Sequence, residues 1–148
     1  MKTSGAKAKG RRLQNFVTLK LRDLFKDILH KDDIRPQLMG QSGTDVILSP
    51  SAKNLIAFDI ECKNQEKLIG AQLESAIEQC EANTEEGRIP LLIFKKNQEP
   101  ERVILHLDHF LELVYPNKDV SFGADERKRL IIEIEKLKQS LVKENYGL

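Results

Sequence analysis

The segment AFDIECKN at residues 57–64 carries charged side chains at alternate positions. Side chains alternate across a β-strand with a period of two, so Asp59, Glu61 and Lys63 would project from one face and apolar residues from the other. The apolar face is typical of a protein core. The charged face indicates either a solvated surface or a site where carboxylates and an ammonium group act together.

These residue types suit phosphodiester hydrolysis, which needs hard oxygen ligands for Mg²⁺ and a cation that orients water and offsets phosphate charge. Asp45 and Glu61 could supply two ligands, and the backbone carbonyl of Cys62 a third. The long side chain of Lys63 could bend back toward them, and Gly43 would let the backbone turn just before Asp45. An acid two residues before a lysine also occurs on solvated strands, so the spacing alone leaves both interpretations open.

Apolar periodicity and turn residues predict the elements that would position these groups. The predicted order is a helix over 9–30, a short edge strand within 33–40, a strand over 44–49, a turn at 49–54, a strand over 55–63, a helix over 66–83, strands over 89–96 and 101–107, a short helix over 108–116, and an amphipathic helix over 124–144. This order describes a compact α/β sheet.

Two of the predicted connections bear on the site. A short turn between the strands at 44–49 and 55–63 favours an antiparallel hairpin, which would bring Asp45 close to Glu61. A strand, a crossover helix and the nearly continuous apolar run IPLLIFKK predict a parallel pair of strands buried on both faces.

Charge is unevenly distributed along the 148 residues, although the net charge is only +1. The first twelve residues contain no acid and five bases, Lys2, Lys7, Lys9, Arg11 and Arg12. A basic arm suits contact with phosphates, and a solvated tail that aids solubility is an equally good interpretation of these charges alone. The absence of Trp and the presence of only two Tyr argue against a stacking platform for single strands.

The composition is that of an ordinary globular protein, with 40% hydrophobic and 32% charged residues. It contains no apolar run long enough for a membrane helix and no secretion signal, so we expect an intracellular, cytoplasmic protein. The only cysteines, Cys62 and Cys80, are expected to be reduced and partly buried. The motif HLDH at 106–109 is more simply a helix start capped by Asp108 than a metal site.

Four segments in order, KGRRLQNF, SGTDVIL, FDIECKNQEKLIGAQLESAIEQC and IPLLIFKK, resemble the PD-(D/E)xK nuclease superfamily. Within it the chain is most similar to archaeal-type Holliday junction resolvases and their phage relatives, over about residues 8–107. The resemblance implies a restriction-endonuclease-like α/β core, α-β-β-β-α-β, whose mixed central sheet is flanked by helices, with extra C-terminal helices. We therefore expect a flexible basic arm at 1–10, a nuclease core at 11–115, and a linker with an amphipathic helix at 116–148 that packs on the core or on a dimer partner.

By this resemblance, Asp45 matches a metal-binding acid, Glu61 the acid of the E-x-K motif and Lys63 its catalytic lysine. Ser42 lies where the resolvases often place a serine near the scissile phosphate. Gln72 matches a glutamine that is common at the start of the helix after E-x-K.

The resemblance also implies catalysis with Mg²⁺, for which Mn²⁺ could substitute, and a homodimer that makes two symmetric cuts in four-way DNA junctions. Lys7, Lys9, Arg11 and Arg12 would contact DNA phosphates. Thr44 departs from the family's proline at little cost.

A second departure is more serious, because Gln14 stands where the family usually offers a glutamate, and a neutral amide weakens the case for a second metal. Two alternatives stay open. One is a nuclease of the same fold with another substrate, such as a restriction-like, repair or genome-processing enzyme. The other is a DNA-binding or assembly protein that has lost catalysis.

Overall fold

The computed structural model describes residues 3–114, 132–133, 136 and 139. It divides into two units, residues 1–109 and 110–148, and the site lies wholly within the first. The helix predicted over 124–144 and the segment 116–148 lie outside the described residues, apart from those four isolated positions. Among the described residues, no helix is both long and apolar enough to cross a membrane.

Helix α1 spans Thr3–Leu24, so it begins and ends earlier than the predicted 9–30. Residues 3–10, which we expected as a flexible arm, are therefore helical. Leu13 and Val17, one helical turn apart, are buried against the sheet. Beyond Leu24 the chain turns back, and Arg22 Nε donates 2.7 Å to the carbonyl of Ile34, which ties the end of α1 to the next strand.

Strand β1 (Ile34–Pro36) pairs antiparallel with β2 (Val46–Leu48), with Ile34 opposite Leu48. A single turn of 3-10 helix, Lys31–Asp33, precedes β1. The predicted turn at 49–54 is wrong, because Pro50–Leu55 forms helix α2. Ser49 caps this helix by accepting from Ala52 N at 3.2 Å, and Pro50 occupies its first position, where a missing N–H costs nothing.

The second sheet contains β3 (Phe58–Asn64), β4 (Ile89–Lys95) and β5 (Arg102–Ile104) in that order. As predicted, β3 and β4 are parallel and are connected through helix α3 (Ala71–Ala82), whereas β4 and β5 are antiparallel. Helix α4 (Leu107–Val114) follows β5. The mixed α/β fold with helices around a mixed sheet is the expected one and is consistent with a restriction-endonuclease-like core.

The predicted hairpin between β2 and β3 is also wrong. Strand β2 pairs with β1, and the two sheets meet through one backbone hydrogen bond, in which Asp45 N donates 2.9 Å to Ile60 O. Helix α2 fills the connection that a hairpin turn would have occupied. This single bond still places Asp45 beside β3. The predicted proximity of Asp45 to β3 therefore holds, although the predicted pairing of the two strands does not.

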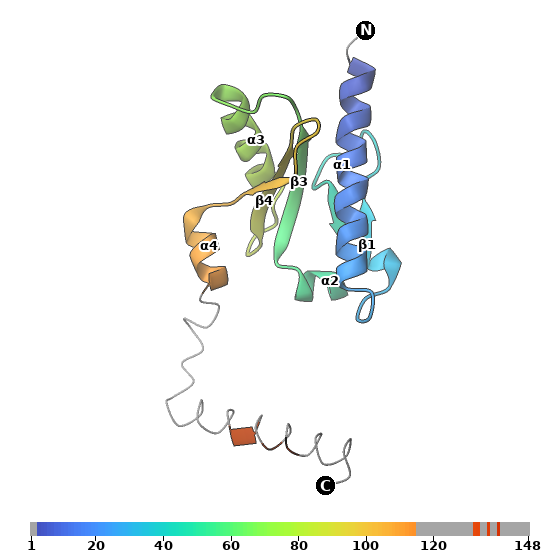
Figure 1. Ribbon diagram of the computed structural model, residues 1–148, viewed down its shortest axis with the longest axis vertical. Coiled ribbons are helices and arrows are strands. Elements are labelled where there is room, and N and C mark those ends of the chain that lie inside the picture. The colour runs from blue at the N-terminus through green and yellow to red at the C-terminus, as the bar shows by residue number, and fades with distance from the viewer. Residues whose placement is uncertain (1–2, 115–131, 134–135, 137–138, 140–148) are drawn as a thin grey trace. The chain divides into compact units, whose positions relative to one another are not determined.

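Helices cover both faces of β3 and β4 (Figure 1). On the α1 face, one cluster joins the helix to the sheet and to β1 and β2; its buried members include Leu13, Val17, Ile34, Ile60, Cys62 and Ile93. On the α3 face, a second cluster contains Leu68, Ala76, Cys80, Leu92 and Phe94. Consecutive residues Leu92 and Ile93 face opposite clusters, as the continuous apolar run of β4 predicts.

Candidate active site

The charged face of β3 is not a solvated surface. Helix α3 and the segment that follows it cover this face, and Asp59 and Glu61 retain only 5% and 3% of their accessible surface. Carboxylates are almost never buried to this extent unless they are paired. The solvated interpretation of the spacing is therefore wrong, and each buried acid needs an account of its partners.

Asp45 lies at the edge of β3 that faces away from β4. Its N–H donates to Ile60 O, and its carboxylate Oδ2 accepts from Cys62 N at 2.7 Å. Because the N–H and C=O of one strand residue point to the same edge, the Cys62 carbonyl also faces Asp45. Gly43, with φ +114°, makes the turn that was expected just before this residue.

The two carboxylates Asp45 and Glu61 are close enough to perturb one another. Burial, and after it the negative charge of Glu61, together raise the pKa of Asp45 from 3.8 to about 6. The Cys62 N–H and the charge of Lys63 act in the opposite direction. A pair of partly desolvated carboxylates that repel one another is an arrangement that a divalent cation would relieve.

Lys63 links Glu61 to α3. Its Nζ lies 2.8 Å from Glu61 Oε1 and 2.8 Å from Gln79 Oε1, and its side chain is 20% exposed. Asn83 Nδ2 donates 3.1 Å to Gly43 O and lies 3.5 Å from Glu61 Oε2. Gln79 in α3 and Asn83, the C-cap of this helix, thus supply two neutral amides that hold the lysine, the glutamate and the glycine turn together.

Sequence reasoning missed Gln79 and Asn83. Together with Gln72 and Ser75, they are spaced three or four residues apart and so fall on one side of a helix, next to the apolar stripe of α3. A row of uncharged polar residues directly after E-x-K was the available signal. Of this row, Gln72 was the residue predicted, and it is exposed in the first turn, lining a cavity of about 370 Å³ with Lys63 and Gln79.

Gln14 is buried, with 7% of its surface exposed, and faces Asp45 from α1. Its Nε2 donates to Asp45 O at 2.5 Å and to Gln37 O at 3.2 Å, so both amide hydrogens are used on backbone carbonyls. The side chain therefore braces the backbone on both sides of the loop that leads to Asp45. Ser42 lies in this loop, is exposed, and its hydroxyl has no hydrogen bond among the described residues.

The four basic residues predicted to contact DNA separate into two pairs on α1. Lys7 and Arg11 line a cavity of about 340 Å³ with Gln14, Asp45 and Cys62. Lys9 and Arg12 line a different cavity, of about 460 Å³, beside the end of β4. The helix therefore presents two cations to the edge of β3 next to Asp45 and Cys62, which we call the carboxylate edge, and two cations to a second opening.

The donor set fits one hard divalent cation. Asp45, Glu61 and the Cys62 carbonyl all supply oxygen donors close to one another, and oxygen ligands are what Mg²⁺ and Mn²⁺ prefer. Among the residues that the structure describes, no three His, Cys, Asp or Glu side chains gather around a common point. The set therefore needs a backbone carbonyl and water to complete a coordination shell, and Gln14 adds no carboxylate.

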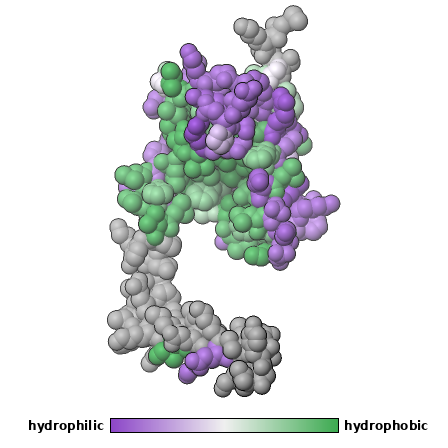
Figure 2. Space-filling view, in the orientation of Figure 1, coloured by the Kyte–Doolittle hydropathy of each residue, from purple (hydrophilic) through white to green (hydrophobic). Residues whose placement is uncertain are grey.

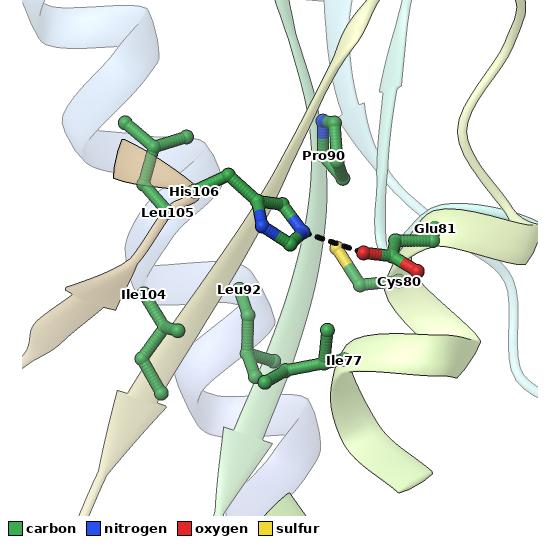
Figure 3. A pocket seen from close by; sticks show the side chains of 8 residues that line it. All are labelled: Ile77, Cys80, Glu81, Pro90, Leu92, Ile104, Leu105 and His106. Carbon is green, nitrogen blue, oxygen red and sulfur yellow. Dashed lines mark hydrogen bonds and ion pairs between the residues drawn. The ribbon is translucent and has the colours of Figure 1, made fainter. Parts of the chain in front are cut away.

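The thiols of both cysteines and the histidine motif lie outside this chemistry. Cys62 and Cys80 are free and buried, and burial raises the pKa of the Cys80 thiol to about 11. His106 Nε2 contacts Glu81 Oε1 at 2.6 Å on the rim of an apolar cavity whose lining includes neither Asp45 nor Glu61 (Figure 3). Asp108 lies in the first turn of α4, not at the capping position.

A family model described as "Phage putative PDDEXK endonuclease" matches residues 5–146. The match spans every site residue named above. No curated protein and no solved structure matches the chain.

Proposed function

The chain belongs to this phage PDDEXK endonuclease family, and from that premise we propose that it is a Mg²⁺-dependent DNA endonuclease whose preferred substrate is a four-way or similarly branched junction. The family supports a nuclease. One observation carries the assignment of the site: Asp45, beside β3, lies close enough to the carboxylate of Glu61 for its pKa to be raised, and Lys63 is bonded to Glu61.

In this proposal Asp45 and Glu61 hold the cation together with the Cys62 carbonyl. Hydrogen bonds from Cys62 N to Asp45 and from Lys63 to Glu61 fix the orientation of both carboxylates before the cation binds. When bound, the cation would lower the pKa of a coordinated water and offset charge on the phosphate. Mn²⁺ has the same preference for oxygen ligands and would substitute for Mg²⁺.

Lys63 would assist the attacking water and balance the charge that develops on the phosphate. Glu61 and Gln79 hold its ammonium group from two sides, which leaves its third donor for the substrate. The water oxygen forms a bond to phosphorus in line with the bond from phosphorus to the 3′ oxygen, which breaks as that oxygen takes a proton. Ser42 and Gln72, both exposed near the site, would contact the phosphate backbone.

The substrate preference rests on similarity to junction resolvases and on the distribution of charge. Lys7 and Arg11 border the carboxylate edge. Contacts from basic side chains to phosphates bind DNA without selecting a base sequence. Recognition would then depend on the shape of the DNA. A homodimer would account for paired cuts in a four-way junction.

The test compares an end-labelled four-way junction with a linear duplex of the same sequence, in Mg²⁺ and in EDTA. We expect paired, symmetric nicks in the junction that disappear with EDTA and in Glu61→Gln. Glu78→Gln is the matched control, because Glu78 lies on the exposed side of α3. Equal cutting of the duplex would retain the nuclease and remove the junction preference, and binding without cleavage would favour a DNA-binding protein.

A further inference from the structure

The second opening beside α1 differs in chemistry from the carboxylate edge. We call it the Phe16 groove; it has a volume of about 460 Å³, and its polar and aromatic lining includes Lys9, Arg12, Phe16, Asn64, Asn97 and Gln98. It lies at the end of the unit where β3 and β4 terminate, a region whose surface is largely hydrophilic (Figure 2). Nothing in the proposed catalysis uses this groove.

Phe16 is an aromatic ring exposed among cations. It is 40% exposed, with the ammonium groups of Lys20 and Lys95 at 5.5 Å and 5.9 Å from its centroid. Lys20 lies on the exposed side of α1 and can swing away from the ring. A cation–π contact at an exposed site is weaker than the stacking of a nucleobase on an aromatic ring, so a base can replace the ammonium group.

The groove retains positive charge after its ion pairs are counted. Lys95 pairs with Glu101, the acid in the lining, whereas Lys9 and Arg12 have no carboxylate partner among the described residues. The nearby acids are engaged elsewhere, since Glu99 pairs with Lys96 and Arg102, and Glu66 accepts from Asn97 N. Two cations are thus available for phosphate oxygens.

Apart from Leu13, the remaining wall consists of side-chain amides. Asn64 Oδ1 is buried without a hydrogen-bond partner, and the side chains of Asn97 and Gln98 make no hydrogen bond within the described part of the chain. Gln98 also has φ +60°, a conformation that a non-glycine residue adopts at a cost. Amides carry both donors and acceptors, which suits the edge of a nucleobase.

We propose that the Phe16 groove binds one unpaired nucleotide of branched DNA, with its base stacked on Phe16, its edge facing the amides, and its phosphates on Lys9 and Arg12. A single ring is no platform for successive bases, but it suffices for one. The choice of DNA as the ligand rests on the proposed function. Asn64 directly follows Lys63 on β3, so a nucleotide held in the Phe16 groove would lie close to the proposed catalytic lysine.

Binding of the full-length chain tests this without requiring cleavage. Two four-way junctions are compared in EDTA and in Ca²⁺, identical except that one carries an extra unpaired 2-aminopurine at the branch point. We expect the wild type to prefer the junction with the extra base by about tenfold, within the range of one base stack, and to quench its fluorescence. Phe16→Leu should abolish both the preference and the quenching, whereas Leu19→Ala, on the same helix, should retain them.

Gln98→Gly provides a second variant that does not threaten folding, because glycine accepts the positive φ without strain. A purely structural Gln98 predicts unchanged binding, whereas the proposal predicts a weaker preference for the extra base in a protein at least as stable. Equal preference in wild type and Phe16→Leu, or no DNA binding at all, would overturn the proposal. Preference for the extra base in a protein that never cleaves DNA would support the groove and refute the nuclease function instead.

Discussion

Asp59 and Glu61 stand two residues apart on the same face of β3 and are almost equally buried, yet their surroundings differ. Asp59 Oδ1 pairs with Arg88 Nε at 2.6 Å, and its Oδ2 accepts from Glu85 N at 2.9 Å. Arg88 in turn donates to the carbonyls of Ile56 and Phe58, both at 2.8 Å. Both oxygens of Asp59 are therefore engaged by strong donors.

Glu61 is satisfied less completely. It has an ammonium group on Oε1 and only a 3.5 Å contact from Asn83 on Oε2, and it faces a second carboxylate, Asp45. The two neighbouring acids are thus suited to different roles: a saturated carboxylate contributes to the fold, whereas one with spare acceptor capacity beside a like charge can bind a cation. The partners distinguish these roles, since burial does not.

The largest expected effects come from neutralising each acid in turn. Glu61→Gln should lower cleavage by about 10²- to 10³-fold, because the site loses a charge that holds the cation, with little loss of stability. Asp59→Asn should cost about 3–5 kcal/mol of unfolding free energy, because the buried Arg88 loses its counter-charge, and should leave cleavage per folded molecule unchanged.

Urea denaturation and single-turnover cleavage of both variants check that Glu61→Gln loses cleavage while Asp59→Asn loses stability. If Asp59→Asn also lost cleavage while folded, Asp59 would belong to the site, and the distinction between the two acids would fail.

A smaller effect is expected from the amide that holds Lys63. Gln79→Ala should lower cleavage by about tenfold, the lower end of the range for residues that orient an active group, because Lys63 loses a 2.8 Å partner. The measurement compares the cleavage rate of Gln79→Ala with that of Glu78→Ala, because Glu78 is an exposed neighbour of Gln79 on α3. A loss equal to that of Lys63→Met would indicate that Gln79 itself contacts the substrate.

Gln14→Glu tests whether α1 can complete the acidic cluster. Glutamate offers no donor to the carbonyls of Asp45 and Gln37, so we expect a loss of about 1–3 kcal/mol in unfolding free energy and no gain in cleavage. Thermal unfolding and a Mg²⁺ titration of cleavage measure both outcomes. Faster cleavage at unchanged stability would instead show that the site accepts a third carboxylate next to Asp45.

The smallest effect concerns pH. The pKa of Asp45 is raised from 3.8 to about 6 in the folded protein, so the folded state holds this proton more tightly than the unfolded chain does. The resulting stability is present below about pH 3.8 and is lost as the pH rises through about 6. Urea unfolding in EDTA across this range should show the loss, and Asp45→Asn should remove it.

The two acids of β3 should differ here as well. Glu61→Gln should lower the pKa of Asp45, because it removes the neighbouring charge, and a carboxyl NMR titration would detect the change. Asp59→Asn should leave that pKa where it is, since Asp59 is not among the groups that shift it. An equal change in both variants would remove the electrostatic difference between the acids.

Local periodicity determined much of this protein. Apolar residues at helical spacing predicted α1 and α3, the continuous apolar run predicted β4 as a buried strand parallel to β3, and alternation placed Asp59, Glu61 and Lys63 on one face. The segment 49–54 shows the limit of such reasoning. Serine followed by proline begins a turn and caps a helix equally well, and only the packing of Ala52 in the core cluster selected α2.

The tertiary structure decided which groups pack on each face of β3, because sequence periodicity carries no information about them. A period of two says that Asp59, Glu61 and Lys63 share a side of β3, but it does not say that α3 covers that side, that Arg88 saturates the first acid, or that Gln79 and Asn83 hold the others. The pairing of β2 with β1 in place of β3 was decided in the same way. The side-chain partners of Asp59, Glu61 and Lys63 outside β3 lie from 16 to 29 residues away along the chain. The composition of the strand therefore determines the available charges, and long-range packing determines which of them stay reactive.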